Sequence, residues 1–140
     1  FLAPLGFYNS AFGCLRTVLD LAGSFSYYIS HQMALDAVTE GRARSLGRKA
    51  TLEWHVHYTP GFANASALLG IVNKWDAVYS ALSAYVHAIP GLALYPSDGY
   101  STWSLDEKVF SRIVEYALQV DDAINLLFPA VFHKETSGLS

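Results

Sequence analysis

The sequence predicts an all-α domain, a bundle of four to five helices that run up and down. Apolar residues recur at three- and four-residue spacing over several long segments, as in helices with one buried face. Strand-like alternation is confined to one short stretch, and no internal repeat is present. We therefore expect residues 1–140 to form a single domain with a substantial core. Because the sequence begins without Met, we also expect it to be part of a longer chain.

The composition is unusually apolar. Hydrophobic residues make up 52% of the chain and charged residues only 15%, against roughly 25% charged residues in an average domain. Such a chain either buries more than usual or meets a partner over a wide apolar surface, so we expect a homodimer or a larger protein complex. The net charge of −3 excludes a domain that is basic throughout, but it allows a local basic patch.

Two further features bear on location. The single cysteine, Cys14, excludes an internal disulfide framework, in agreement with a cytoplasmic protein, and we interpret it as a buried structural thiol. The most apolar long stretch, residues 78–95, contains His87 and Pro90, whereas a membrane span needs about 20 apolar residues. We interpret that stretch as a buried helix and a turn, and we expect no membrane association.

The first helix is expected over residues 7–30, with polar residues on a second face. Arg16 and Asp20 are four residues apart on this polar face and can pair. A helix over residues 31–39 follows, and Gly41 is expected at its C′ position. The apolar face of the first helix comprises Tyr8, Phe12, Leu15, Leu19 and Ala22.

Residues 41–50 concentrate positive charge. Such a run is either a solvated loop or a loop that contacts phosphate groups, in which glycines let the backbone approach. Its candidate RNA-binding residues are Arg42, Arg44, Arg48 and Lys49.

Residues 51–59 alternate and favour either a short strand or an extended linker. In a strand His55 and His57 would point to one face, an arrangement that suits a metal ion. Because no third ligand is identified, we expect no metal site.

A small, apolar helix is expected over residues 62–72, and the central helix of the bundle over residues 73–89. The central helix has an apolar stripe that includes Trp75, Val78 and Leu82. A second ridge carries a carboxylate, two hydroxyls and an imidazole at spacings of four, three and four residues: Asp76, Ser80, Ser83 and His87.

The end of the chain predicts one more long helix. Pro90 and Gly91 stop the central helix, and residues 92–103 form a loop. Residues 104–107 have the form of a capping box, so the last helix is expected over residues 105–127. Pro129 should end or kink it.

The segments NSAFGCLRTVLDLA (9–22) and WDAVYSALSAYVH (75–87) resemble bacterial HEPN-like domains of defence systems. They cover about a fifth of the chain. The resemblance implies a four- or five-helix domain that often dimerises. Many such domains are metal-independent ribonucleases with an Arg-x4–6-His motif, and several are inactive scaffolds. This chain has the histidine, His87, but Ser80, Ala81 and Leu82 stand where the arginine is expected.

A site for RNA cleavage can still be assembled from these residues. Attack by a 2′-hydroxyl needs a base, an acid and positive charge at the phosphate. His87 is a candidate base or acid, Arg16 a candidate phosphate ligand and Asp20 a group that orients either. Ser83 would support them, together with Asp76 and Tyr79. Against this, the helix dipole alone favours a histidine near a helix C-terminus, and polar ridges are commonly just solvated.

Three functions therefore compete. The first is a HEPN-like domain of a prokaryotic defence or toxin system that cleaves RNA without a metal or cofactor. The second is an inactive HEPN-like scaffold or dimerisation domain in a larger complex, which the low charge and the missing arginine favour. The third, a bundle that binds a cofactor or metal, lacks a Glu-x-x-His pair; it would use His31, His55, His57, His87 and His133.

Overall fold

The computed structural model describes residues 8–87 and 107–136, with side chains up to Phe132. All regular structure in these ranges is α-helical, so the expected all-α bundle is confirmed. The described residues form six helices, one more than expected. Three are long: α1 (Tyr8–Tyr28), α5 (Ile71–Val86) and α6 (Glu107–Thr136). Three are short: α2 (Gln32–Thr39), α3 (Arg48–Tyr58) and α4 (Phe62–Leu69).

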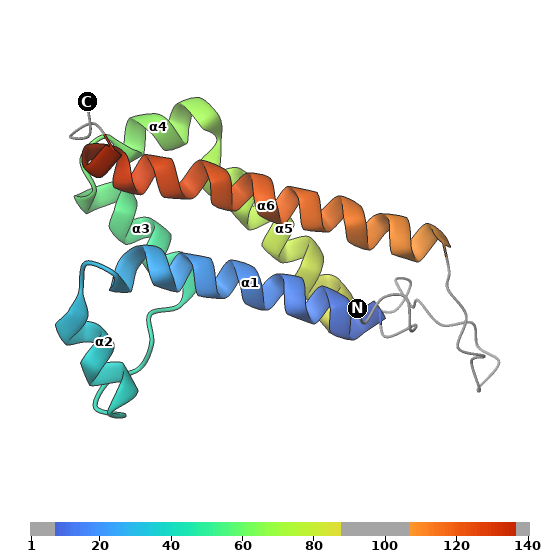
Figure 1. The fold of residues 1–140 in the computed structure, drawn as a ribbon, viewed down its shortest axis with the longest axis horizontal. Helices are drawn as coiled ribbons and strands as arrows, with labels where there is room; N and C mark the ends of the chain where they lie inside the picture. Colours follow the sequence, from blue (N-terminus) through green and yellow to red (C-terminus); the bar gives the residue numbers. More distant parts are fainter. Residues whose placement is uncertain (1–7, 88–106, 137–140) are drawn as a thin grey trace.

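The three long helices lie side by side and alternate in direction (Figure 1). α5 runs antiparallel to α1: Phe12 near the start of α1 stacks on Tyr85 near the end of α5, with ring centroids 4.2 Å apart. α6 runs parallel to α1, since the Phe12 ring also meets Tyr116 in the first half of α6. The short helices α2, α3 and α4 form the connection from α1 to α5 at one end of the bundle.

The strand or linker expected over residues 51–59 is wrong, because this segment belongs to helix α3. The alternation in the sequence does not correspond to the buried face. The buried positions are Thr51, Leu52 and His55, which are one and three residues apart, as on a helix packed along one side. His55 and His57 consequently point in different directions, and only His55 is buried.

Glycines and a proline define the other boundaries. Gly41 follows α2 with a φ of 71°, as expected for a C′ residue. Gly70, with a φ of 67°, separates α4 from α5, so the central helix begins at Ile71 rather than at Asn73. Pro129 does not end α6, which continues to Thr136. The stop at Pro90, the loop over 92–103 and most of the capping box lie outside the described residues.

The core lies where α1, α5 and α6 meet. The expected apolar stripe of the central helix is buried at Trp75, Val78, Leu82 and Tyr85. Trp75 packs against α1 at Gly23, where an added Cβ would lie 3.5 Å from the indole ring. The largest completely buried apolar side chains are Trp75, Phe12, Phe62, Leu19, Ile71, Leu82 and Leu127.

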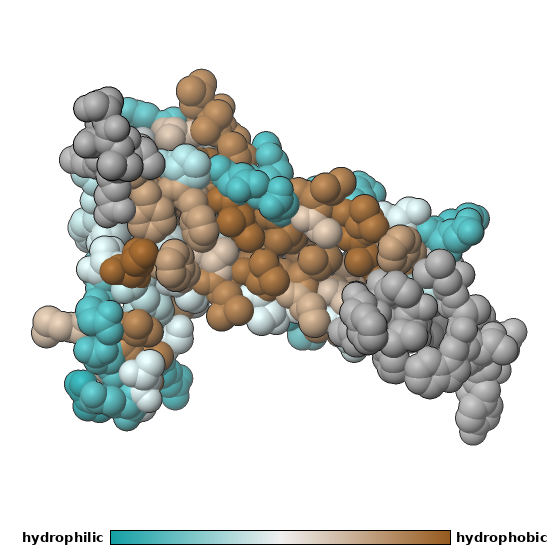
Figure 2. Space-filling model, viewed as in Figure 1, coloured by the Kyte–Doolittle hydropathy of each residue, from teal (hydrophilic) through white to brown (hydrophobic). Residues whose placement is uncertain are grey.

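The surface is apolar in places. Figure 2, in the same view as Figure 1, shows hydrophobic atoms gathered over the middle of the molecule, where α1 and α6 lie.

Cys14 is exposed, so its interpretation as a buried thiol is wrong. None of the helices in the described ranges is both long enough and apolar enough to cross a membrane.

Two neighbouring positions of α5 test this arrangement. Leu82→Ala should destabilise the fold by roughly 2–5 kcal/mol, because it leaves a cavity in the core. Ser83→Ala should change stability by less than about 1 kcal/mol: the Ser83 hydroxyl is buried and has no hydrogen-bond partner among the described residues, so nothing is lost with it. Urea unfolding of both variants measures the difference. Equal midpoints would contradict the assigned faces.

Candidate functional site

The polar faces of α1 and α5 meet at Arg16. Its Nε and Nη2 atoms donate to the hydroxyl oxygen of Tyr79, at 3.1 and 2.8 Å. Its Nη1 atom lies 3.4 Å from Nε2 of His87, the residue that caps the C-terminal end of α5. The antiparallel packing of α1 and α5 therefore brings together the arginine and the histidine that the sequence proposed as partners, 71 residues apart in the chain.

A second arginine completes the group from α3. The guanidinium of Arg48 lies over the face of the Tyr79 ring, 4.1 Å from its centroid, an arrangement typical of a cation–π contact. Arg48 also forms an ion pair with Asp76, one turn before Tyr79 on α5. We call Arg16, Arg48, Asp76, Tyr79 and His87 the Arg–His cluster. It joins three helices around one tyrosine.

The contact with Arg16 gives the His87 ring the role of acceptor. A guanidinium can only donate, so in this contact Nε2 of His87 accepts from Arg16. The 3.4 Å distance is long for a hydrogen bond, so the contact is weak and can open. Arg16 uses three N–H groups in these contacts and has five, so two remain for an anion.

The other two candidate catalytic residues lie nearby but outside these contacts. Asp20 is half-buried on α1, one turn beyond Arg16. Within the described residues it forms no ion pair with Arg16, which turns to Tyr79 instead. Ser83 lies one turn before His87, with its hydroxyl oxygen buried away from the cluster's hydrogen bonds. Its main-chain carbonyl accepts the N–H of His87.

The four residues expected to bind RNA do not act as one loop. Arg48 is the first residue of α3 and belongs to the Arg–His cluster. Lys49, the next residue, lies 3.8 Å from Glu53 across one helical turn. Arg42 is paired with Glu40, and Arg44 is exposed in the connection between α2 and α3. The basic segment therefore leads from an exposed connection into the cluster.

Sequence reasoning assigned Tyr79 a supporting role and placed Arg48 among the phosphate-binding residues. Tyr79 is three residues after Asp76 and four before Ser83, so helical spacing alone could have placed it on the polar ridge. The position of Arg48 depends on how α3 packs against α5, and no local pattern in the sequence carries that information.

A second arginine–tyrosine contact lies at the same end of α5. Arg112 of α6 donates from Nη1 to the Tyr85 hydroxyl at 3.0 Å. That hydrogen bond raises the pKa of Arg112, and burial, followed by the neighbouring Tyr85, raises the pKa of Tyr116. The hydrogen bond between Arg112 and Tyr85 does not involve a histidine, so Arg112 provides a comparison for Arg16.

Among the histidines whose side chains the structure describes, His55 is the buried one. Its Nε2 atom is 3.0 Å from the Ser26 hydroxyl of α1, and its Nδ1 atom is 2.8 Å from the Thr59 hydroxyl. Because Ser26 gives its own hydrogen to the Gly23 carbonyl, Nε2 of His55 is the donor and Nδ1 accepts from Thr59. A histidine that donates to serine cannot take its proton, so this network is structural.

No group of three or more His, Cys, Asp or Glu side chains gathers as metal ligands in the part of the chain that the structure describes. The side chain of His133 lies outside that part.

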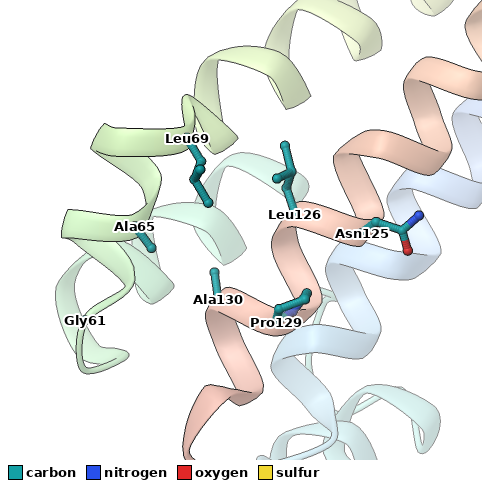
Figure 3. A pocket seen from close by; sticks show the side chains of 7 residues that line it. All are labelled: Gly61, Ala65, Leu69, Asn125, Leu126, Pro129 and Ala130. Carbon is teal, nitrogen blue, oxygen red and sulfur yellow. The ribbon is translucent and has the colours of Figure 1, made fainter. Parts of the chain in front are cut away.

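A pocket of about 320 Å³ lies between α4 and α6 (Figure 3). Leu69 and Leu126 project into it, and the Asn125 amide points away. It contains no titratable side chain: the lining residues are Gly61, Ala65, Leu69, Asn125, Leu126, Pro129 and Ala130.

Comparison with known proteins finds no match: no family model, no curated protein and no solved structure is significantly similar to this chain. The functional argument therefore rests on the geometry of the described residues.

His55 makes stability depend on pH. Burial, with a smaller contribution from nearby His31, lowers the pKa of His55 from 6.5 to about 4. The folded state is thus fully stabilised above pH 6.5. Between pH 6.5 and 4, His55 binds a proton in the unfolded chain but not in the folded chain. The free energy of unfolding therefore falls by about 3 kcal/mol over this range.

Urea unfolding between pH 7.5 and 4.5 measures this slope. His55→Gln should flatten it, whereas His57→Gln, at an exposed position of the same helix, should leave it unchanged. An unaltered slope in the His55 variant would show that other groups cause the acid sensitivity.

Proposed function

We propose that this chain is a HEPN-like domain of a prokaryotic defence or toxin system that cleaves RNA at the Arg–His cluster, as a cytoplasmic protein. The observation that carries the proposal is the contact between Arg16 and His87. The arginine missing from the spacer before His87 is replaced in space by an arginine from another helix. The resemblance of residues 9–22 and 75–87 supports the same assignment, since each segment supplies one partner of that contact.

The roles follow from the chemistry of the side chains. His87 presents the lone pair of Nε2, which can accept the proton of a ribose 2′-hydroxyl when the weak contact with Arg16 opens. The 2′-oxygen then attacks the adjacent phosphorus and the 5′-oxygen leaves with a proton. The products are a 2′,3′-cyclic phosphate and a 5′-hydroxyl. The imidazolium formed at His87 can return that proton.

The two guanidinium groups supply the positive charge. Arg16 retains two N–H groups for a phosphate oxygen, and Arg48 is held beside it by Tyr79 and Asp76. Charge that is already in place when the phosphate gains negative charge lowers the barrier most effectively. Asp20, one turn from Arg16 on α1, is the group proposed to orient Arg16 or His87 once RNA is bound. Ser83 supports the main chain of His87.

A second function is favoured by a different observation. Large apolar side chains of α1 and α6 are exposed, which supports a scaffold that forms a homodimer or docks in a larger protein complex. If the domain is a scaffold, the Arg–His cluster is an interhelical contact that holds α1, α3 and α5 together. RNA cleavage distinguishes the two functions.

The decisive variants are His87→Ala and Arg16→Ala. If the domain cleaves RNA, removing the base should reduce the rate by at least about 100-fold. Removing Arg16 should reduce it by roughly 100- to 1,000-fold, the range for loss of one group that stabilises transition-state charge. Cleavage of a labelled single-stranded RNA by the purified chain, with identification of the product ends, is the measurement.

Arg112→Ala is the matched control: it also removes an arginine bound to a tyrosine hydroxyl of α5, but one whose hydrogen bond is to Tyr85 and not to His87. It should cleave at the wild-type rate, and an RNA with a 2′-deoxyribose at the cleaved position should stay intact. If wild-type protein leaves varied RNA intact, or if the His87 variant cleaves normally, the scaffold function replaces the ribonuclease.

The basic connection before α3 can be tested separately, in a His87→Ala background in which RNA remains whole. Arg42→Ala and Arg44→Ala should each weaken RNA binding, because each removes one phosphate contact. Each should also reduce the slope of log K against log salt by about 0.7, the value for one phosphate of a single strand. Fluorescence anisotropy at several salt concentrations measures both. An unchanged slope would mean that this connection does not touch the RNA.

A further inference from the structure

The hydroxyl group of Tyr79 carries a hydrogen that the cleavage reaction described above does not use. Its oxygen accepts two hydrogen bonds from Arg16, at 3.1 and 2.8 Å. A tyrosine hydroxyl can also donate one hydrogen, and none of the residues that the structure describes accepts it. Tyr79 is only half-buried on α5, so that hydrogen is available to a molecule bound at the Arg–His cluster.

Arg16 places the Tyr79 hydroxyl and the His87 ring on two sides of one anion-binding group. Its contacts with Tyr79 use the Nε–H group and one N–H group of Nη2, and its contact with His87 uses one N–H group of Nη1. Each Nη atom has two N–H groups, so one remains on Nη1 and one on Nη2. A phosphate that accepts both of these has His87 beside Nη1 and Tyr79 beside Nη2.

In-line displacement at phosphorus needs a proton-transferring group on each side. The attacking 2′-oxygen and the leaving 5′-oxygen lie on opposite sides of the phosphorus, so the base that serves one oxygen cannot protonate the other at the same moment. His87 is the base of the proposed reaction. On the other side of Arg16 lies the Tyr79 hydroxyl, and a phenol carries its proton at neutral pH.

We propose that Tyr79 is the general acid of this reaction, an assignment that rests on the proposed ribonuclease function. As the 2′-oxygen bonds to phosphorus, His87 takes the 2′-hydroxyl proton. As the P–O5′ bond breaks, the Tyr79 hydroxyl gives its proton to the 5′-oxygen. The His87 imidazolium then releases a proton and the Tyr79 phenolate takes one up, so both groups return to their starting forms.

The neighbours of Tyr79 are suited to the phenolate that this step leaves behind. Its oxygen keeps the two hydrogen bonds from Arg16, and the Arg48 guanidinium lies over its ring, 4.1 Å from the centroid. Both positive groups are in place before the proton leaves, which is the arrangement that stabilises developing negative charge most effectively.

A leaving group that needs no proton tests this role. Two oligonucleotides are compared in single-turnover cleavage by the purified chain: an ordinary RNA, and the same RNA with sulfur replacing the 5′-oxygen of the cleaved bond. Tyr79→Phe keeps the ring beneath Arg48 but removes the proton, so it should cleave ordinary RNA at least about 100-fold more slowly. A thiol releases its proton far more readily than an alcohol, so the variant should cleave the sulfur-containing RNA within about tenfold of the wild-type rate.

Two further variants are the controls. Tyr85→Phe is the matched one, because Tyr85 also lies on α5 and its hydroxyl also accepts from an arginine, Arg112, at 3.0 Å. It should cleave both RNAs at the wild-type rate. Arg16→Ala removes positive charge from the phosphate whichever atom leaves, so it should slow the cleavage of both RNAs alike. Circular dichroism checks that each variant is folded.

The outcomes separate the general acid from the ribonuclease itself. If Tyr79→Phe slows both RNAs equally, Tyr79 only positions Arg16; if it cleaves ordinary RNA at the wild-type rate, Tyr79 takes no part in cleavage. Either result overturns the general acid and leaves the ribonuclease standing. A wild-type chain that leaves both RNAs intact overturns the proposed function and the general acid with it.

Discussion

The antiparallel packing of α1 against α5 is the constraint on which the rest of the structure depends. It is held by the stacked rings of Phe12 and Tyr85 and by the close approach of Trp75 to Gly23. The same alignment sets Arg16 opposite His87. Because a helix is rigid over this length, a shift of α1 by one turn, about 5.4 Å, would lose the ring stack and the Arg–His contact together. Core and site are therefore one geometric arrangement.

α3 fixes that arrangement from the side. Near its start, Arg48 binds the ring of Tyr79 and the carboxylate of Asp76 on α5. Two turns later, His55 is hydrogen-bonded to Ser26 of α1. The short helix thus connects the two long ones through polar groups at both ends. The His55–Ser26 contact is buried and paired, so it specifies the orientation of α3, because another position would leave a buried polar atom without a partner. The Arg48–Asp76 pair lies at the surface.

α1 has three surfaces with different tasks. One packs into the core, one presents Arg16 and Asp20, and the third carries the exposed stripe from Val18 to Ile29. The polar and the apolar surfaces are on opposite sides. The residues of the Arg–His cluster are therefore not part of the exposed apolar stripe.

The sequence by itself determined the helical class, the buried face of α5 and the glycine that ends α2, because these follow from local periodicity and from backbone conformations that glycine alone adopts easily. It also proposed Arg16 and His87 as partners. It misjudged α3, where a short alternating stretch fits a strand as well as a helix, and Cys14, which lies at the surface. Only the tertiary structure decided that Arg48 joins the cluster and that His55 is buried. The physical reason is that periodicity tells which side of a helix is apolar, whereas the neighbours of each side are set by how helices far apart in the chain pack together.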